Sequence, residues 1–146
     1  MDSRPGLAMD ATSLEVFLAR EFPQVAADFA IEAAGPEGVR LRLRVAEKHL
    51  RPGGTVSGPT IFALADVGIY LAILARIGPV ALAVTTNASV DFMRKPAAGA
   101  DLLAEIRILK LGRTLAVGDV LVFSEGAEGP VARASMTYAI PPKAAG

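Results

Sequence analysis

Apolar residues fill positions 59–74 almost completely, and the single charged side chain in this run is Asp66. Ser57 and Gly58 are suitable N-cap residues, and the proline that follows them suits a first helical turn, where its missing N–H would be unsatisfied anyway. Gly78 tolerates the left-handed conformation that often ends a helix. The pattern predicts a long central helix between Ser57 and Gly78, enclosed on all sides by the rest of the fold.

A shorter amphipathic pattern lies near the N-terminus. In residues 13–22, apolar side chains recur at helical spacing, with Thr12 or Ser13 as the N-cap and Pro23 at the end. We therefore expect a short N-terminal helix. Residues 1–11 are expected to be a flexible N-terminal segment.

Two extended segments, residues 29–33 and 39–45, flank the turn signal Gly-Pro-Glu-Gly. The second segment alternates apolar residues with arginines at positions 40, 42 and 44, and this arginine face is interpreted as a solvated sheet face. Residues 47–55 carry turn signals without periodicity and predict a loop leading into the central helix. The single histidine of the chain, His49, is expected at the surface or rim of this loop.

Four more extended segments follow the central helix, and short breaks rich in glycine and proline separate the last three. Their ranges are 80–92, 100–110, 113–124 and 131–140. The order of elements predicts one α+β domain over residues 1–146, in which an antiparallel sheet of about six strands wraps around the central helix.

Composition narrows the possible chemistry. The 146 residues include 15 basic and 15 acidic side chains, so no excess of either sign would attract nucleic acid or an acidic membrane surface. There is no cysteine and only His49 as a histidine, which argues against a disulfide, a thiolate nucleophile or a bound metal. The first residues lack the features of a secretion signal, so the cytoplasm is the expected compartment.

Asp66 requires an explanation, because a carboxylate in apolar surroundings loses hydration worth several kcal/mol unless something compensates it. It could be a structural carboxylate that reaches an arginine, a backbone N–H or water. It could also be a reactive carboxylate in a substrate cleft. A transmembrane helix is disfavoured, because a span needs about 20 apolar residues and Asp66 lies near the middle of a shorter run.

Three segments together resemble the PaaI-like acyl-CoA thioesterases of the hotdog fold. They are GTVSGPTIFALAD at 54–66, TTNASVDFMRKPAAG at 85–99 and ARASMTYAIPP at 132–142. The resemblance implies that the central helix is the sausage of the hotdog and the sheet its bun. It also implies hydrolysis of an acyl-CoA thioester, with no cofactor besides the coenzyme A that belongs to the substrate.

The resemblance also implies roles for individual residues. The backbone N–H of Gly58 would bind the thioester oxygen, and Asp66 would activate water as a general base or attack as a nucleophile. Thr85 aligns best with a hydroxyl residue that orients water in some members. Thr86 is one position away, and because neighbouring residues of a strand point to opposite faces, only one of the two can serve. Ser57 and Pro59 would contact the substrate, although members usually have His-Gly-Gly where this chain has Ser-Gly-Pro.

The spacing of Gly58 and Asp66 bears on assembly. Eight residues along one helix correspond to ~12 Å, too far for both to act on one carbonyl carbon. Two antiparallel helices from a symmetric pair of chains would bring them together. We therefore expect a homodimer, or a dimer of such dimers as is frequent in the family.

Coenzyme A carries phosphates that need cations, and the candidates are Arg94, Lys95 and Arg113, each of which could equally be a solvated surface charge. Two other functions stay open. One is a non-catalytic acyl-CoA-binding protein that lost activity with the altered motif. The other is a hydratase or dehydratase of the same fold, which is disfavoured because such enzymes usually pair a histidine with the carboxylate.

Overall fold

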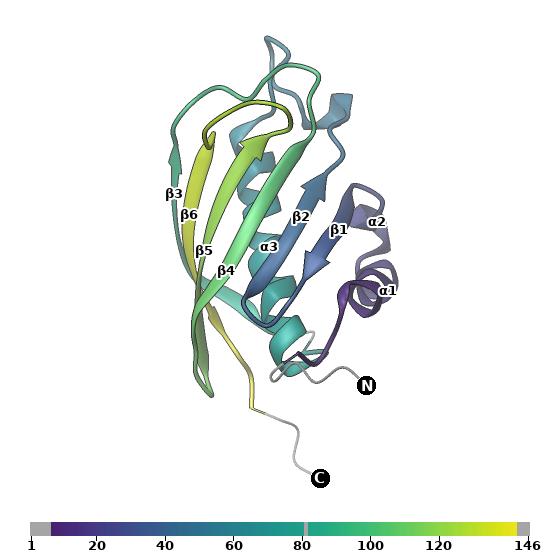
Figure 1. Cartoon of the computed structure of the whole chain (residues 1–146), viewed down its shortest axis with the longest axis vertical. Coiled ribbons are helices and arrows are strands. Elements are labelled where there is room, and N and C mark those ends of the chain that lie inside the picture. Colours follow the sequence, from purple (N-terminus) through teal and green to yellow (C-terminus); the bar gives the residue numbers. More distant parts are fainter. Residues whose placement is uncertain (1–6, 81, 143–146) are drawn as a thin grey trace.

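The computed structural model describes residues 7–80 and 82–142 and has a six-stranded antiparallel sheet curved around one long helix (Figure 1). The strand order is β1-β2-β4-β5-β6-β3, so β1 and β3 form the two edges. The helices are α1 (Ala11–Glu21), α2 (Pro23–Ala26), the 3-10 turn η1 (Glu47–His49) and α3 (Gly58–Ile77). The strands are β1 (Phe29–Ala34), β2 (Gly38–Leu43), β3 (Val84–Phe92), β4 (Leu102–Leu111), β5 (Leu115–Ser124) and β6 (Ala132–Ala139). This is the hotdog architecture that the sequence predicts.

The central helix α3 forms where it was expected, with Ser57 as its N-cap and Gly78 as its C-cap. Its C-terminal half is enclosed, since residues 68–75 are all buried. The N-terminal half is not, which corrects the expectation of a helix covered on every side. Pro59, Phe62 and Ala63 are exposed and Asp66 is half-buried, so one stripe of α3 is left uncovered. In length and apolar composition α3 could cross a membrane, but it is mostly buried, as is typical of the core helix of a globular protein.

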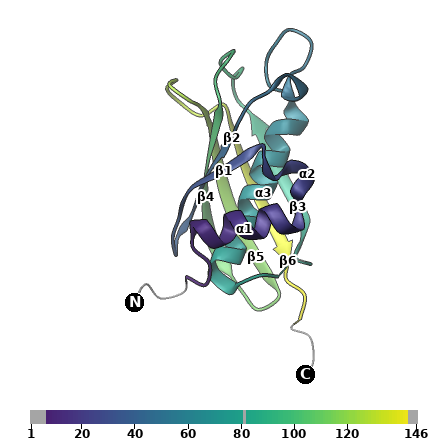
Figure 2. The same cartoon turned by 90° about the vertical axis from the view of Figure 1, so that its right-hand side faces the viewer.

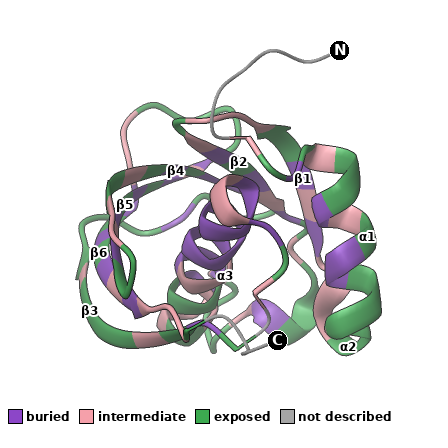
Figure 3. Ribbon diagram, turned by 90° about the horizontal axis from the view of Figure 1, so that it is seen from below, coloured by how far each residue is buried: buried purple, intermediate pink, exposed green. Residues whose placement is uncertain are grey.

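Figure 3 shows the sheet curving around α3, with buried segments along both. Burial alternates along β5 and β6, as expected for strands with one face toward a core. On β5 and β6 several inward side chains are small or β-branched, such as Ala116, Val120 and Ala134, and all three are buried. Helix and sheet approach closely at Gly68, where an added Cβ would lie 2.6 Å from the Ile106 side chain. The fold therefore uses small residues to bring the strands close to the helix.

The N-terminal helix begins slightly earlier than expected. Its N-cap is Asp10, whose side chain accepts a hydrogen bond from the Ser13 N–H at 2.9 Å, and not Thr12 or Ser13. Pro23 ends α1 as expected but also begins α2, because proline fits the first turn of a helix. α1 lies beside β1 and α3 (Figure 2).

The predicted flexible segment 1–11 is partly corrected. Residues 1–6 lie outside the described residues. Ala8 and Met9 each donate a backbone hydrogen bond to the Ala75 carbonyl oxygen, at 2.6 and 3.1 Å, and Met9 is buried. Residues 7–10 are therefore held against the C-terminal end of α3.

The strand expected at 80–92 begins only at Val84. Before it, the Ala83 N–H donates to the Val80 carbonyl oxygen at 3.1 Å and Leu82 lies in a turn. Apolar composition alone does not distinguish such a turn from a buried strand.

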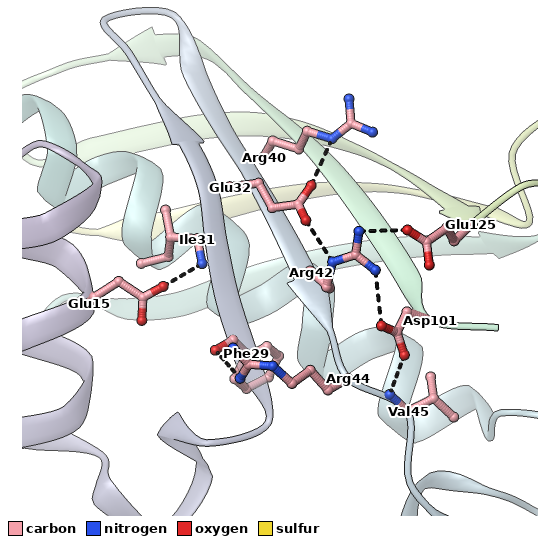
Figure 4. Close-up of polar contacts among 10 residues, drawn as sticks. All are labelled: Glu15, Phe29, Ile31, Glu32, Arg40, Arg42, Arg44, Val45, Asp101 and Glu125. Carbon is pink, nitrogen blue, oxygen red and sulfur yellow. Dashed lines mark hydrogen bonds and ion pairs between the residues drawn. The ribbon is translucent and has the colours of Figure 1, made fainter. Parts of the chain in front are cut away.

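The arginine face of β2 is not simply solvated. Arg42, whose side chain is only 20% exposed, binds Glu32, Asp101 and Glu125 at 2.6, 2.9 and 2.7 Å (Figure 4). Arg44 donates to the carbonyl oxygen of Phe29 at 3.1 Å. These contacts connect β1, β2 and the residues that flank β4 and β5.

His49 is also not at the rim, since it is 8% exposed. Its Nδ1 accepts the Ala46 N–H at 2.9 Å, and its Nε2 lies 3.6 Å from a carboxylate oxygen of Asp28. The His49 carbonyl oxygen accepts the N–H of Ser57 at 2.9 Å. His49 thus belongs to the loop that holds the N-terminal end of α3.

Candidate active site

Asp66 lies on the uncovered stripe of α3 and is bound by two hydroxyl groups. Its Oδ1 accepts hydrogen bonds from Thr85 Oγ1 at 2.5 Å and from the Tyr138 hydroxyl at 2.7 Å. The Tyr138 hydroxyl is also 3.0 Å from the main-chain oxygen of Asp66. The second carboxylate oxygen, Oδ2, takes part in neither hydroxyl contact.

A β-bulge in β3 determines which threonine faces Asp66. Ala88, Val90 and Phe92 pair with inward-facing residues of β6, and strict alternation would next turn Thr86 inward. The register shift between Thr85 and Asn87 adds one residue, so Thr85 pairs with Tyr138 instead. Thr86 donates to the Thr137 carbonyl oxygen at 3.2 Å on the exposed side. Of the two threonines, Thr85 is the one placed beside the carboxylate.

Tyr138 was not among the residues singled out from the sequence. It is 3% exposed, on β6 between β5 and β3, and burial raises the pKa of its phenol, with further raising effects from the hydrogen bond and negative charge of Asp66. The phenol therefore stays protonated and can donate. In the sequence this tyrosine looks like any inward residue of an alternating strand, so only the fold reveals its partner.

The Ser57-Gly58-Pro59 motif, which stands where family members usually have His-Gly-Gly, lies at the N-terminal end of α3. The Ser57 hydroxyl accepts the Thr60 N–H at 3.3 Å and is 2.8 Å from the Thr60 hydroxyl, so Ser57 serves as the helix cap. Gly58 is the first residue of the helix, where backbone N–H groups have no intrahelical acceptor. A Cβ added to Gly58 would lie 3.5 Å from the Phe92 ring, which places Gly58 near the end of β3. Pro59 is exposed.

The cations suggested for coenzyme A lie at opposite ends of β3. Arg94 and Lys95 are exposed and follow its end, and Arg94 Nη1 is 3.4 Å from the Glu128 carbonyl oxygen. Arg113 lies in the turn between β4 and β5, at the other end. There it borders an apolar cavity of about 910 Å³, together with Leu82 near the start of β3.

One chain therefore contains two half-sites. The first consists of Asp66, Thr85 and Tyr138 near the start of β3, with Arg113 at the same end. The second consists of Gly58 with Phe92, Arg94 and Lys95 near the end of β3. The structure does not bring the two half-sites together within one chain.

The surface between the half-sites is apolar. The side chains of Phe62 and Phe92 are 38% and 57% exposed, and Val84 at the start of β3 is also exposed. By contrast Ile69 and Tyr70, farther along α3, are buried in the core. Exposed aromatic side chains beside an edge strand are typical of a surface that another protein chain covers.

Within the described ranges, no three or more histidine, aspartate or glutamate side chains are grouped to hold a metal ion. That the reaction needs no metal and no separate cofactor stays a prediction.

Comparison with known proteins identifies the family of this chain. Residues 53–131 match the family model described as the Thioesterase superfamily. A proposed esterase of Pseudomonas aeruginosa is 34% identical over 68% of this chain and 72% of its own length.

Solved structures of similar proteins have the same fold. A proposed thioesterase of Silicibacter sp. TM1040 is 60% identical and has a TM-score of 0.88, over 93% of this chain and 94% of its own. A mutant of the phenylacetic acid degradation protein PaaI from Thermus thermophilus is 31% identical with a TM-score of 0.70, over 82% of this chain and 99% of its own. A Streptococcus mutans protein bound to acetyl-CoA is 29% identical with a TM-score of 0.69, over 79% and 90% of the two chains.

Proposed function

Because this chain belongs to the thioesterase superfamily and has a PaaI-like hotdog fold, we propose that it hydrolyses an acyl-CoA thioester to a carboxylic acid and free coenzyme A. The observation that carries the proposal is the half-buried carboxylate of Asp66, held by two hydroxyl groups on an otherwise apolar stretch of helix. The neighbour that contains acetyl-CoA supports a coenzyme A thioester as the ligand.

The active site is proposed to be shared by two chains. A two-fold axis near the middle of β3 would pair the β3 edges of two copies in antiparallel orientation. The start of one β3 then lies beside the end of the other, so Asp66 of one chain faces Gly58 of its partner. The same operation gives two equivalent sites per dimer.

The proposed pairing would also bring the candidate phosphate-binding cations of the two chains close together. Arg113 of one chain would approach the end of the partner's β3, where Arg94 and Lys95 follow. Phosphate groups favour such clusters of positive charge. The coenzyme A phosphates are therefore proposed to bind across the dimer interface, beside the altered motif with Ser57 and Pro59.

The chemistry follows from the two half-sites. The N–H of Gly58, at the positive end of the α3 dipole, would stabilise the oxyanion that forms when the thioester carbonyl is attacked. Asp66 would either remove a proton from the attacking water or attack the carbonyl carbon itself. On the first route the tetrahedral intermediate expels the coenzyme A thiolate, which takes the proton that Asp66 removed from water. On the second route the carboxylate displaces the thiolate, which takes a proton from solvent, and a water molecule then hydrolyses the acyl–Asp66 anhydride to release the carboxylic acid and the free carboxylate.

The first experiment is a panel of acyl-CoA substrates with thiol release as the readout. With the best substrate, Asp66→Asn should lower kcat by ~10² or more and change KM little, because it removes the base or nucleophile and keeps the shape. The matched control is Asp119→Asn, which alters an exposed aspartate on β5, separated from β3 by β6, and should keep the parental rate. Parental activity of folded Asp66→Asn would refute the assignment, and binding of acyl-CoA by the parent without hydrolysis would favour the non-catalytic alternative.

The shared site has its own test. Gly58→Pro removes the proposed N–H donor at a helix position that tolerates proline. Homodimers of Asp66→Asn and of Gly58→Pro should each be nearly inactive. A mixed dimer contains one intact site, because Asp66 of the Gly58→Pro chain faces Gly58 of the Asp66→Asn chain. Refolding the two variants together should restore roughly a quarter of the parental activity, because half of the random dimers are mixed and each has one of two sites intact. No recovery, with mixed dimers demonstrated by mass spectrometry, would exclude a site built from two chains.

A further inference from the structure

Both hydroxyl groups beside Asp66 contact the same carboxylate oxygen, Oδ1, and neither contacts Oδ2. This difference indicates separate roles for the two oxygens. Both Thr85 and Tyr138 donate to Oδ1, and an ionised carboxylate oxygen has lone pairs for both. We propose that Tyr138 is a positioning residue, which anchors Oδ1 and so presents Oδ2 to the water or thioester carbon. This inference rests on the proposed function, since it names the oxygen that would act.

Tyr138 is the more rigid of the two anchors. Thr85 lies on the edge strand next to the β-bulge, whereas Tyr138 lies on β6 and is hydrogen-bonded into the sheet on both sides. Its ring is buried, with the Tyr70 ring centroid 6.3 Å away. A phenol packed in this way has little freedom to rotate away from Asp66.

The anchor also fixes the carboxylate to its own helix. Because the Tyr138 hydroxyl lies within 3.0 Å of both the main-chain oxygen and Oδ1 of Asp66, it sets the side chain relative to the α3 backbone. A free aspartate rotates broadly about its terminal torsion. Nucleophilic attack and proton removal both need the reacting atoms close and aligned, so an unanchored carboxylate would spend much of its time in unproductive orientations.

Aromatic ring contacts connect Tyr138 to the N-terminal helix α1. Tyr70 contacts Tyr138 on one side and the Phe22 ring on the other, edge-on at 5.7 Å. Phe17 of α1 also lies 6.3 Å from Tyr70. The anchor of Asp66 is therefore supported by a row of aromatic side chains that begins at α1.

The test is Tyr138→Phe, which removes the hydroxyl and keeps the ring. We expect kcat to fall by about tenfold, the scale for loss of one orienting hydrogen bond, with KM within about twofold of the parent. The control is Met136→Leu, a volume-conserving change on the same strand at a buried, inward position. It should leave both constants near parental values.

A double-mutant cycle separates positioning from general destabilisation. If Tyr138 acts through Asp66, Tyr138→Phe should cause no further loss in the Asp66→Asn background. A full tenfold loss in that background, or parental kcat for Tyr138→Phe alone, would overturn the proposal.

The orientation of the carboxylate gives a readout that does not depend on activity. In crystal structures, Asp66 should have one orientation in the parent and a rotated or divided one in Tyr138→Phe. An unchanged single orientation would refute the positioning role even if no acyl-CoA proves to be a substrate. Absence of hydrolysis by the parent would instead count against the proposed function.

Discussion

Burial gives the two tyrosines of the chain a measurable effect on stability. It raises the pKa of both Tyr70 and Tyr138 from the ordinary value of 10.0. In the unfolded chain both phenols ionise near pH 10, whereas in the folded chain they stay neutral to higher pH. The unfolded state therefore releases protons first, and its ionisation favours unfolding as the pH rises above about 10.

We predict that the free energy of unfolding is insensitive to these groups below about pH 9 and falls above pH 10. Each phenol contributes at most about 1.4 kcal/mol per pH unit. Tyr138→Phe should make the decline less steep, as measured by urea unfolding at several pH values. The chain has no tryptophan, so tyrosinate absorbance can be followed in the same samples. Equal slopes for the parent and the variant would contradict the prediction.

At the scale of elements, the contact of α3 with β4 allows almost no added volume. Gly68→Ala adds a Cβ that would lie 2.6 Å from Ile106, which is itself buried. Alanine favours a helix over glycine by about 1 kcal/mol, but overpacking a core costs about 1–3 kcal/mol. We predict a net loss of about 1 kcal/mol in unfolding free energy, measured by chemical denaturation.

Two further variants check the cause of this loss. Ile106→Val should destabilise the parent by about 1 kcal/mol but should cost less in the Gly68→Ala background, because it removes Cδ1, one of the two Ile106 atoms that would lie 2.6 Å from the added Cβ. Gly58→Ala, in the same helix, meets Phe92 at an ordinary 3.5 Å and should not be destabilised. Independent, additive effects of Gly68→Ala and Ile106→Val would show that the contact is not the cause.

The elements that could be predicted from the sequence are those in which local signals agree. For α3 the apolar run, the cap at Ser57 and the glycine after the last turn all indicate one helix. Pro23 could end one helix or begin another, and it does both. The apolar residues before Val84 could have begun a strand, but β3 begins only at Val84. The bulge that turns Thr85 inward could not be predicted, because it depends on pairing with a strand more distant in the sequence.

The candidate site was predictable to a similar extent. Asp66 stood out because a lone carboxylate in an apolar run is costly, and Gly58 because of the family resemblance. Tyr138 did not stand out, because its hydroxyl has a partner only once β6 packs against α3. The interpretation of Arg42 as a solvated side chain was wrong for the same reason, since its carboxylate partners come from three other segments.

At the scale of the whole molecule, the exposed stripe of α3 and the free edge of β3 predict a homodimer. Phe62→Asp should give monomers with little activity, because it places a charge on the surface that the partner is expected to cover. Light scattering at micromolar concentration measures the assembly. Leu121→Asp is the control, since Leu121 is similarly exposed, at 40%, but lies on β5 away from this stripe. A parent that is monomeric, or a Phe62→Asp variant that remains a fully active dimer, would exclude this interface.

The strand order has a consequence for how the protein matures during synthesis. β3 follows α3 directly in the chain, yet its only hydrogen-bonded neighbour among the described strands is β6, which is synthesised after the other five. Until then Tyr138, one of the two hydroxyl partners of Asp66, is missing, and β3 lacks the strand with which it pairs. The proposed site and the proposed dimer edge are therefore completed together, once β6 has been synthesised, and a nascent chain that stalls before β6 would present β3 to any other strand that could pair with it.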